Sequence, residues 1–356
     1  MIIIANKNLL YSFVYHYYFM VKELGVAYYG NLFLDHAIND LKEMTEHGCN
    51  SILIAMSEYD WEVWRKNIFE IAKAAKTQFD FNVYINLWSW GGIFGGEAPS
   101  FYLHRNVESR QIVSNNNIQL PAACPNTRKF KNYLFGAIEK IATVKYIDGF
   151  FWDEPHYYYL SKSGNNYSCR CNECQTLFEK IFNKPMPTTL TEDVIKFKEK
   201  SIINFLREIS QKVKDADSSK KITVCLVPPP IETGISDWDY LCSELNDVID
   251  VFGSDPYWLL FGKSLRYVEK YASKTVELAR KYNLESQLWC LGFLIPRKKE
   301  DELREAIQIF DKYKVDSIFT WCYRGAEGMF IESHNPKKVW QIIGDTYNEI
   351  KRKYNL

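Results

Sequence analysis

Residues 148–156 read Asp-Gly-Phe-Phe-Trp-Asp-Glu-Pro-His, a short apolar run that ends in two adjacent acids. With Ile147 before it, the run predicts a strand over Ile147–Trp152. Because the run is apolar throughout instead of alternating with polar residues, we expect the strand to be covered on both faces, as in a parallel sheet. Asp153 and Glu154 then lie where the strand ends.

The same pattern, a strand followed by a helix, repeats on both sides of this stretch. Seven further apolar runs predict strands at Val26–Gly30, Ser51–Met56, Asn82–Trp88, Ile222–Val227, Val248–Phe252, Ser286–Leu291 and Ser317–Cys322. Amphipathic stretches predict helices at Leu34–His47, Asp60–Lys76, Thr127–Val144, Cys174–Phe182 with Asp193–Lys214, Asp237–Leu245, Leu265–Tyr282, Asp301–Lys312 and Pro336–Tyr354. Eight such units predict an α/β fold, the (β/α)8 TIM barrel, which needs about 250 residues plus insertions. A doubly wound open sheet is the second choice, because no glycine-rich phosphate turn follows the first strand.

Two long connections follow the third and fourth strands, over Ser89–Asn126 and Pro155–Cys174. Both begin at carboxyl ends of strands, where barrel enzymes build their sites, and loops of this length inside a domain are usually functional. We interpret residues 20–356 as a single barrel domain. Residues 1–19 are either an appendage to the barrel or the result of a misassigned start, because Met20-Val21-Lys22-Glu23 reads as a natural start.

The charge and composition narrow the classes of partner. The 356 residues hold 44 Lys and Arg against 44 Asp and Glu, so the net charge is zero and neither nucleic acid nor an anionic membrane is a favoured partner. Residues 8–21 are too short and too polar to span a bilayer, and no signal cleavage site is evident. We therefore expect a cytoplasmic protein whose nine cysteines are free thiols or metal ligands.

Carboxylates at strand ends are the strongest candidates for chemistry. Asp153 and Glu154 follow the fourth strand, and Asp255 follows the sixth strand in Gly-Ser-Asp-Pro-Tyr-Trp. Burial raises a carboxyl pKa, and a proton donor needs a raised pKa while its partner stays ionised. The alternative is that these acids cap loops or pair with arginine, and that Asp255 only closes an Asp-Pro turn.

Other residues near the carboxyl ends of the strands are candidates for contact with a substrate. They are acids, aromatic rings that suit the flat faces of sugars, and one histidine. The set comprises Glu58, Trp88, Glu97, His156, Tyr257, Trp258, Trp289 and Trp321. Glu327 is a weaker candidate, and Asp60 is expected to cap a helix. Aromatic residues make up 16% of the chain, but barrel cores use them too, so each ring has an ordinary structural alternative.

Cys169, Cys171 and Cys174 form a C-x-C-x2-C motif in the connection after the fourth strand. Three thiolates this close can share a tetrahedral zinc ion, and Cys124 is the candidate for the fourth ligand. A site closed by four thiolates is structural. The alternative is a metal-free cluster of reduced thiols, and we expect no organic cofactor.

The stretch Trp152-Asp153-Glu154-Pro155 resembles the W-N-E-P sequence that ends strand four in a large clan of barrel glycosidases. Cys124 and the C-x-C-x2-C motif resemble the zinc-bearing β-galactosidases of glycoside hydrolase family 42. The resemblance covers about residues 120–185. It implies that Glu154 is the acid/base and that the four cysteines bind zinc beside the active site.

Two departures limit what the resemblance implies. The clan's asparagine, which contacts the sugar, is Asp153 here. The clan's nucleophile is a glutamate that ends strand seven, but Ser286–Leu291 ends without an acid. Asp255 is the best replacement, so β-galactosidase specificity does not carry over.

Three functions remain open on the sequence. The first is a glycoside hydrolase in which Glu154 protonates the glycosidic oxygen, Asp255 acts as nucleophile or base, and Asp153 positions the sugar. The second is a catalytically silent barrel that binds a carbohydrate. The third is another chemistry at the same place, such as a lyase, a transglycosidase or a metal-assisted hydrolase.

Overall fold

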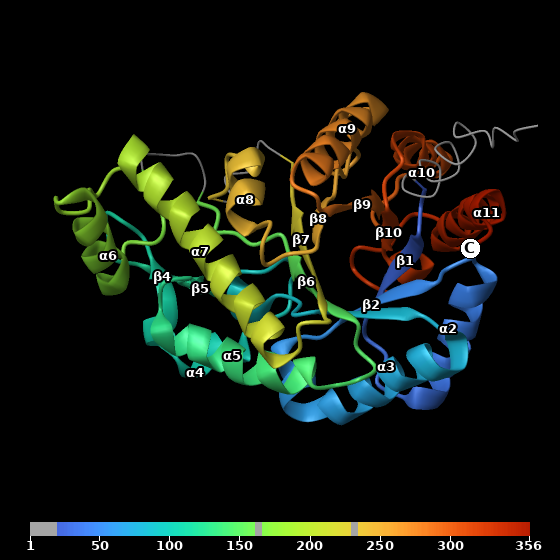
Figure 1. The fold of residues 1–356 in the computed structure, drawn as a ribbon, viewed down its shortest axis with the longest axis horizontal. Coiled ribbons are helices and arrows are strands. Elements are labelled where there is room, and N and C mark those ends of the chain that lie inside the picture. Colours follow the sequence, from blue (N-terminus) through green and yellow to red (C-terminus); the bar gives the residue numbers. More distant parts are fainter. Residues whose placement is uncertain (1–19, 161–165, 229–233) are drawn as a thin grey trace, which may run out of the picture.

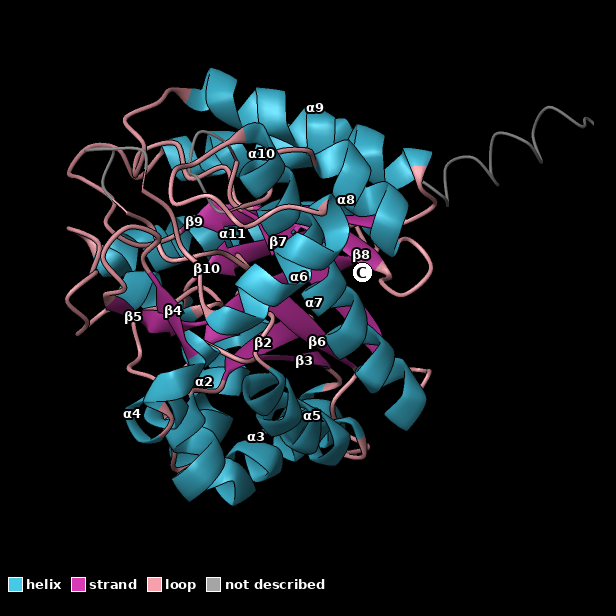
Figure 2. Cartoon of the chain, turned by 90° about the vertical axis from the view of Figure 1, so that its left-hand side faces the viewer, coloured by secondary structure: helices cyan, strands magenta, loops and turns pink. Residues whose placement is uncertain are grey.

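The structure, a computed structural model, describes residues 20–160, 166–228 and 234–356. The predicted appendage, residues 1–19, lies outside the described residues. Eight parallel strands close into a barrel (Figure 2), with the hydrogen-bonded order β1-β10-β9-β8-β7-β6-β3-β2. The barrel strands are β1 (Glu23–Tyr28), β2 (Ser51–Ala55), β3 (Asn82–Asn86), β6 (Gly149–Asp153), β7 (Lys221–Leu226), β8 (Val251–Ser254), β9 (Glu285–Leu291) and β10 (Ser317–Trp321).

A helix follows each barrel strand and packs outside it. These helices are α2 (Leu34–Glu46), α3 (Arg65–Phe79), α5 (Arg128–Ala142), α7 (Glu192–Ala216), α8 (Trp238–Leu245), α9 (Leu265–Lys281), α10 (Glu302–Tyr313) and α11 (Pro336–Tyr354). The predicted (β/α)8 barrel is confirmed. At its closure, β1 pairs with β10, and the rings of His47 and Trp340 stack at 4.6 Å between the ends of α2 and α11.

The predicted boundaries need small corrections. The sequence predicts the first strand over Val26–Gly30, but it runs Glu23–Tyr28, since Gly30 has a positive φ of 80° that ends the extended chain. The sixth strand lies two to three residues later than the sequence predicts. Before α3, Asp60–Trp64 forms a π-helical turn. Asp60 is not the N-cap of that turn, because its carboxylate accepts hydrogen bonds from the backbone and hydroxyl of Ser57.

Aromatic side chains fill the inside of the barrel. The ring of Trp289 lies 5.0 Å from that of Phe151 and 5.0 Å from that of Phe319. Gly25 on the neighbouring strand β1 makes room for Phe319, because a Cβ on Gly25 would fall 2.2 Å from that ring. Part of the high aromatic content of the chain therefore serves to pack the core, as in other barrels whose interiors are filled by side chains.

The connection after β3 carries its own small structure. It contains α4 (Phe101–Arg105), an antiparallel hairpin of β4 (Arg110–Ile112) and β5 (Gln119–Ala123), and single 3-10 turns at Trp90–Gly92 and Val107–Ser109. The connection after β6 contains α6 (Asn172–Phe182) before α7. Figure 1 shows α6 and the hairpin together at one end of the molecule, opposite α10 and α11. In the described ranges, no helix is both long and apolar enough to cross a membrane.

Candidate functional site

Asp153 and Glu154 reach the same point at the carboxyl end of β6. Neighbouring residues of a strand normally face opposite sides. Glu154, however, adopts φ 39°, a conformation that residues other than glycine rarely adopt. Both carboxyl groups then approach Gly95, where a Cβ would lie 3.1 Å from Asp153 Oδ2 and 3.3 Å from Glu154 Oε2. Glycine at this position therefore leaves room for both carboxyls.

Hydrogen bonds fix this end of β6 to the connection after β3. The backbone of Gly95 donates to the carbonyl of Asp153 at 2.9 Å, and His156 donates its backbone N–H to the carbonyl of Ile93 at 2.8 Å. Asn86, at the end of β3, donates its Nδ2 to Asp153 Oδ2 at 2.9 Å. The imidazole Nδ1 of His156 lies 2.6 Å from the carbonyl oxygen of Glu154.

Asp255, which follows β8, is a third acid at this end of the barrel. It is only 2% exposed, and its Oδ1 has no hydrogen-bond partner in the described part of the chain. Burial, the charge of Glu154 and a hydrogen bond to the Glu154 side chain raise the pKa of Asp255 well above its ordinary range. Burial and the same charge also raise the pKa of Asp153. The side chains of Glu154 and Asp255 therefore interact, and their catalytic pairing stays a prediction.

Glu97 adds a fourth carboxyl near the other three. Burial, and then the charge of Glu154, raise the pKa of Glu97. Among the described residues, no ion pair joins a lysine, arginine or histidine to Asp153, Asp255 or Glu97. We call Asp153, Glu154, Asp255 and Glu97 the carboxylate group. Burial and the neighbouring acids thus favour the protonated forms of Asp153, Asp255 and Glu97.

A stack of three aromatic rings lies at the same end of the barrel. Tyr29, just after β1, stacks on Trp88 at 5.5 Å and on Trp321 at 5.4 Å. The Nε1 of Trp88 is buried and has no partner among the described residues. The sequence prediction included the two tryptophans but missed Tyr29, because only the barrel closure brings β1, β3 and β10 together.

The other predicted contact residues are more buried. Glu58 is 1% exposed, and its carboxylate accepts hydrogen bonds from the backbone of Gly91 and Tyr102 and from the hydroxyl of Ser100. It therefore organises the connection after β3. Trp258 donates its Nε1 to Glu302, Trp289 lies inside the barrel, and Tyr257 is 7% exposed. Direct contact of these residues with a substrate stays a prediction.

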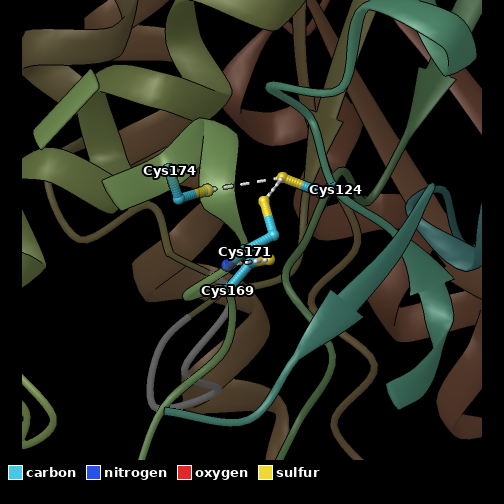
Figure 3. A group of neighbouring side chains, drawn as sticks. All are labelled: Cys124, Cys169, Cys171 and Cys174. Atoms are coloured by element: carbon cyan, nitrogen blue, oxygen red, sulfur yellow. Dashed lines mark hydrogen bonds between the residues drawn. The ribbon is translucent and has the colours of Figure 1, made fainter. Parts of the chain in front are cut away.

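The four predicted cysteine ligands lie together and are buried. The Sγ atoms of Cys124, Cys169, Cys171 and Cys174 are all within 4.8 Å of one another. Figure 3 shows that Cys174 comes from α6, Cys169 and Cys171 from the chain just before it, and Cys124 from the segment after β5. Among the thiols, Cys124 lies 3.4 Å from Cys174 and 3.6 Å from Cys171.

The chemistry of this cluster fits a tetrahedral metal ion. Ligand bonds of about 2.3 Å place thiolate sulfurs about 3.8 Å apart, close to the observed separations. The backbone N–H groups of Ile112 and Cys171 point at Cys169 Sγ, and Asn126 Nδ2 donates to Cys174 Sγ. Such N–H donors stabilise thiolates, so the cluster is able to bind a metal ion.

Comparison with known proteins identifies the class of fold. Neither a protein-family profile nor a curated protein matches the sequence. Solved structures do match, and among them are glycoside hydrolases built on the same eight-stranded parallel barrel. The chain therefore has a glycosidase-like fold.

Among these structures are β-galactosidases of glycoside hydrolase family 42. The enzyme from G. stearothermophilus superposes with a TM-score of 0.72 at 14% identity, over 95% of this chain and 57% of the other. The β-galactosidase of Halorubrum lacusprofundi gives 0.69 at 12% identity, over 92% and 58%. The chain thus spans a little over half the length of these enzymes. The glycoside hydrolase domain of PgaB from Bordetella bronchiseptica gives 0.58 at 11%, over 90% and 98%.

Proposed function

We propose that this chain is a glycoside hydrolase that cleaves a glycosidic bond in an oligo- or polysaccharide. The observation that carries the proposal is the direct interaction of Glu154 with buried Asp255 at the carboxyl end of the barrel. Two carboxyls this close share a proton, so one can donate while the other stays ionised. The barrel is the one that the similar glycoside hydrolases have.

The roles follow from exposure and neighbours. Glu154 is partly exposed, so it is the group that protonates the glycosidic oxygen of a bound sugar. The raised pKa of Asp255 favours its protonated form in the free protein, so we infer that the shared proton passes to Glu154 when a sugar binds. Asp255 then acts as nucleophile or base, and Asp153, held by Asn86, positions the sugar.

The remaining substrate contacts belong to the same proposal. Trp88 and Trp321, stacked through Tyr29, would support a sugar ring, with Glu97 and His156 at the edge of the carboxylate group. The four cysteines would hold a structural zinc ion, which would link the connection after β3 to the connection after β6. Free thiols of this number suit the reducing cytoplasm.

A panel of 4-nitrophenyl glycosides and their disaccharide counterparts tests the function. Wild-type protein should cleave at least one sugar in both series, and Glu154→Gln should lose the disaccharide reaction while it retains part of the nitrophenyl reaction. Nitrophenolate needs little protonation to leave, which explains the difference. Glu277→Gln, which changes an exposed acid of α9 outside the carboxylate group, is the control. Full disaccharide cleavage by Glu154→Gln would contradict the role of Glu154.

A second candidate is a barrel that binds carbohydrate without turnover. The burial of Asp255 favours it, because a nucleophile must reach the sugar and Asp255 is only 2% exposed. Calorimetry with the same sugars separates the two proposals. Binding without any cleavage across the pH range would support the silent barrel.

A further inference from the structure

A cavity of about 770 Å³ adjoins the carboxylate group, between the connections after β3 and β6. Glu97 and His156 line it on one side, and both lie next to Glu154. Phe101 and Tyr158 contribute aromatic surface. Its volume is within the range of about 300–1,000 Å³ that is usual for ligand sites.

Arg110 is one of the residues that line this cavity. Its Nη2 donates to the carbonyl of Leu103 at 3.2 Å, while its Nε is buried and has no hydrogen-bond partner in the described ranges. No ion pair joins Arg110 to a carboxylate among those residues. A partly buried guanidinium is normally paired, and its planar fork of donors suits an oxyanion.

The position of Arg110 is held by its neighbour in β4. The side chain of Gln111 is fully buried and donates to the carbonyl of Ala123 at 2.9 Å. It also accepts hydrogen bonds from the backbone of Tyr158 and the hydroxyl of Ser168. Gln111 thus anchors the strand, while Arg110 lines the cavity. The guanidinium is thus on a rigid element, as a binding group should be.

We propose that this cavity is a sugar subsite next to the cleaved bond, and that Arg110 binds an oxyanion on that sugar, such as the carboxylate of a uronic acid. His104, which also lines the cavity, adds a second donor from α4. The proposal rests on the proposed function for its place beside the cleaved bond. Glu97 does not oppose an anion at Arg110, because its carboxyl interacts with Glu154 and its raised pKa favours the neutral form.

Binding of monosaccharides tests the subsite without any need for cleavage. We would measure D-glucuronate and D-galacturonate against D-glucose and D-galactose by NMR titration. Wild type should bind at least one uronate about ten- to a hundredfold more tightly than its neutral counterpart, the effect of one hydrogen-bonded charge pair. Arg110→Gln should abolish the preference. Arg105→Gln should keep it, since Arg105 pairs with Glu62 and does not line the cavity.

A second variant of Arg110 and a competing anion give two further tests of the subsite. Arg110→Lys retains the charge without the fork and should bind uronate with intermediate affinity, even if Arg110→Gln does not fold. Inorganic sulfate should compete with uronate but not with the neutral sugars. Equal affinity for uronates and neutral sugars, or an unchanged preference in a folded Arg110→Gln protein, would overturn the subsite. The proposed function fails separately, if no glycoside is cleaved by wild type.

Discussion

Asp250 and Asp255 stand at opposite ends of the same strand, β8, and their surroundings differ completely. Asp250 forms an ion pair with Lys214 at 2.8 Å and accepts the backbone N–H of Ile222 at 2.8 Å. Among the described residues, Asp255 forms no ion pair with a cation and has one oxygen without a hydrogen-bond partner, and its side chain interacts with that of Glu154. Asp250 is paired with a cation, whereas burial and a neighbouring acid raise the pKa of Asp255.

The contrast extends to the other acids at each end of the barrel. At the amino end, Asp148 binds Lys76 and the backbone of Val83, and Asp316 binds Lys22 and the backbone of Ser286. In each case an acid just before one strand accepts the N–H of a residue in a neighbouring strand. At the carboxyl end, the acids of the carboxylate group lie near one another instead. The acids at the amino end are thus placed to stabilise the barrel, and the proposed function places the chemistry at the carboxyl end, where barrel enzymes have their sites.

The largest expected effect comes from Asp255→Asn. Removal of the ionisable partner of Glu154 should lower the rate of glycoside cleavage by about 10²- to 10⁴-fold, the usual contribution of acid/base groups. The measurement is kcat with the best substrate from the glycoside panel. Asp250→Asn is the matched control on the same strand and should retain activity within about twofold. Equal losses in the two variants would mean that the two ends do not differ in function.

The cysteine cluster gives the next largest effect, on stability. Purified protein should contain one zinc ion per chain by metal analysis, and Cys171→Ser should lose it. Loss of a ligand that binds only the folded state should lower the free energy of unfolding by about 4 kcal/mol at a free zinc concentration a thousandfold above Kd. Cys242→Ser, a buried thiol of α8 outside the cluster, is the control. A chain that binds no zinc and is unchanged by Cys171→Ser would contradict a structural metal site.

Asp250→Asn should have a smaller effect, on stability alone. The pair with Lys214 is partly exposed, so solvent screening leaves it little more than about 1 kcal/mol, and the hydrogen bond to Ile222 contributes a similar amount. Thermal unfolding should therefore shift downward by a few degrees. An unchanged melting temperature would show that the acids at the amino end do not stabilise the barrel.

The smallest effect is a dependence of stability on pH. Burial and Glu154 raise the pKa of Asp255 in the folded chain above the unfolded value of about 3.9. Below that value the proton is bound in both states. As the pH rises through the folded pKa, the wild type loses stability that Asp255→Asn does not lose. The melting temperature of Asp255→Asn minus that of wild type should therefore increase from about pH 4 to about pH 8, and a constant difference would contradict the raised pKa.

The barrel is predictable from the sequence because each strand is a local apolar run. All eight strands and the helices after them are found this way, with errors of two or three residues at a few ends. The hairpin β4–β5 is missed, since Arg110–Ile112 is only three residues long and Gln119–Ala123 contains a proline. Short strands of this kind depend on pairing with a distant segment, which no local pattern shows.

The site is predictable only where a residue follows a strand directly. Asp153, Glu154 and Asp255 are predicted this way, and their roles stay a prediction. Cys169, Cys171 and Cys174 are predicted by their spacing, and Cys124 by its place at the start of the helix before the fourth strand. Sequence reasoning misses a second set, because the importance of its members lies in contacts across the barrel: Asn86, Gly95, Tyr29 and Arg110. Glu58 illustrates the converse: its position after β2 suggests substrate contact, whereas its hydrogen bonds go to the connection after β3.

The most direct test of the account is the titration of Asp255 itself. Protein labelled with 13C at the aspartate carboxyls would be followed by NMR across the pH range, and the Asp255 signal identified by its loss in Asp255→Asn. We predict that this signal titrates well above the ordinary value of about 3.9 and shifts in Glu154→Gln, because the two groups share a proton. A signal that titrates near the ordinary value and ignores Glu154→Gln would contradict the carboxylate pair on which the proposed function rests.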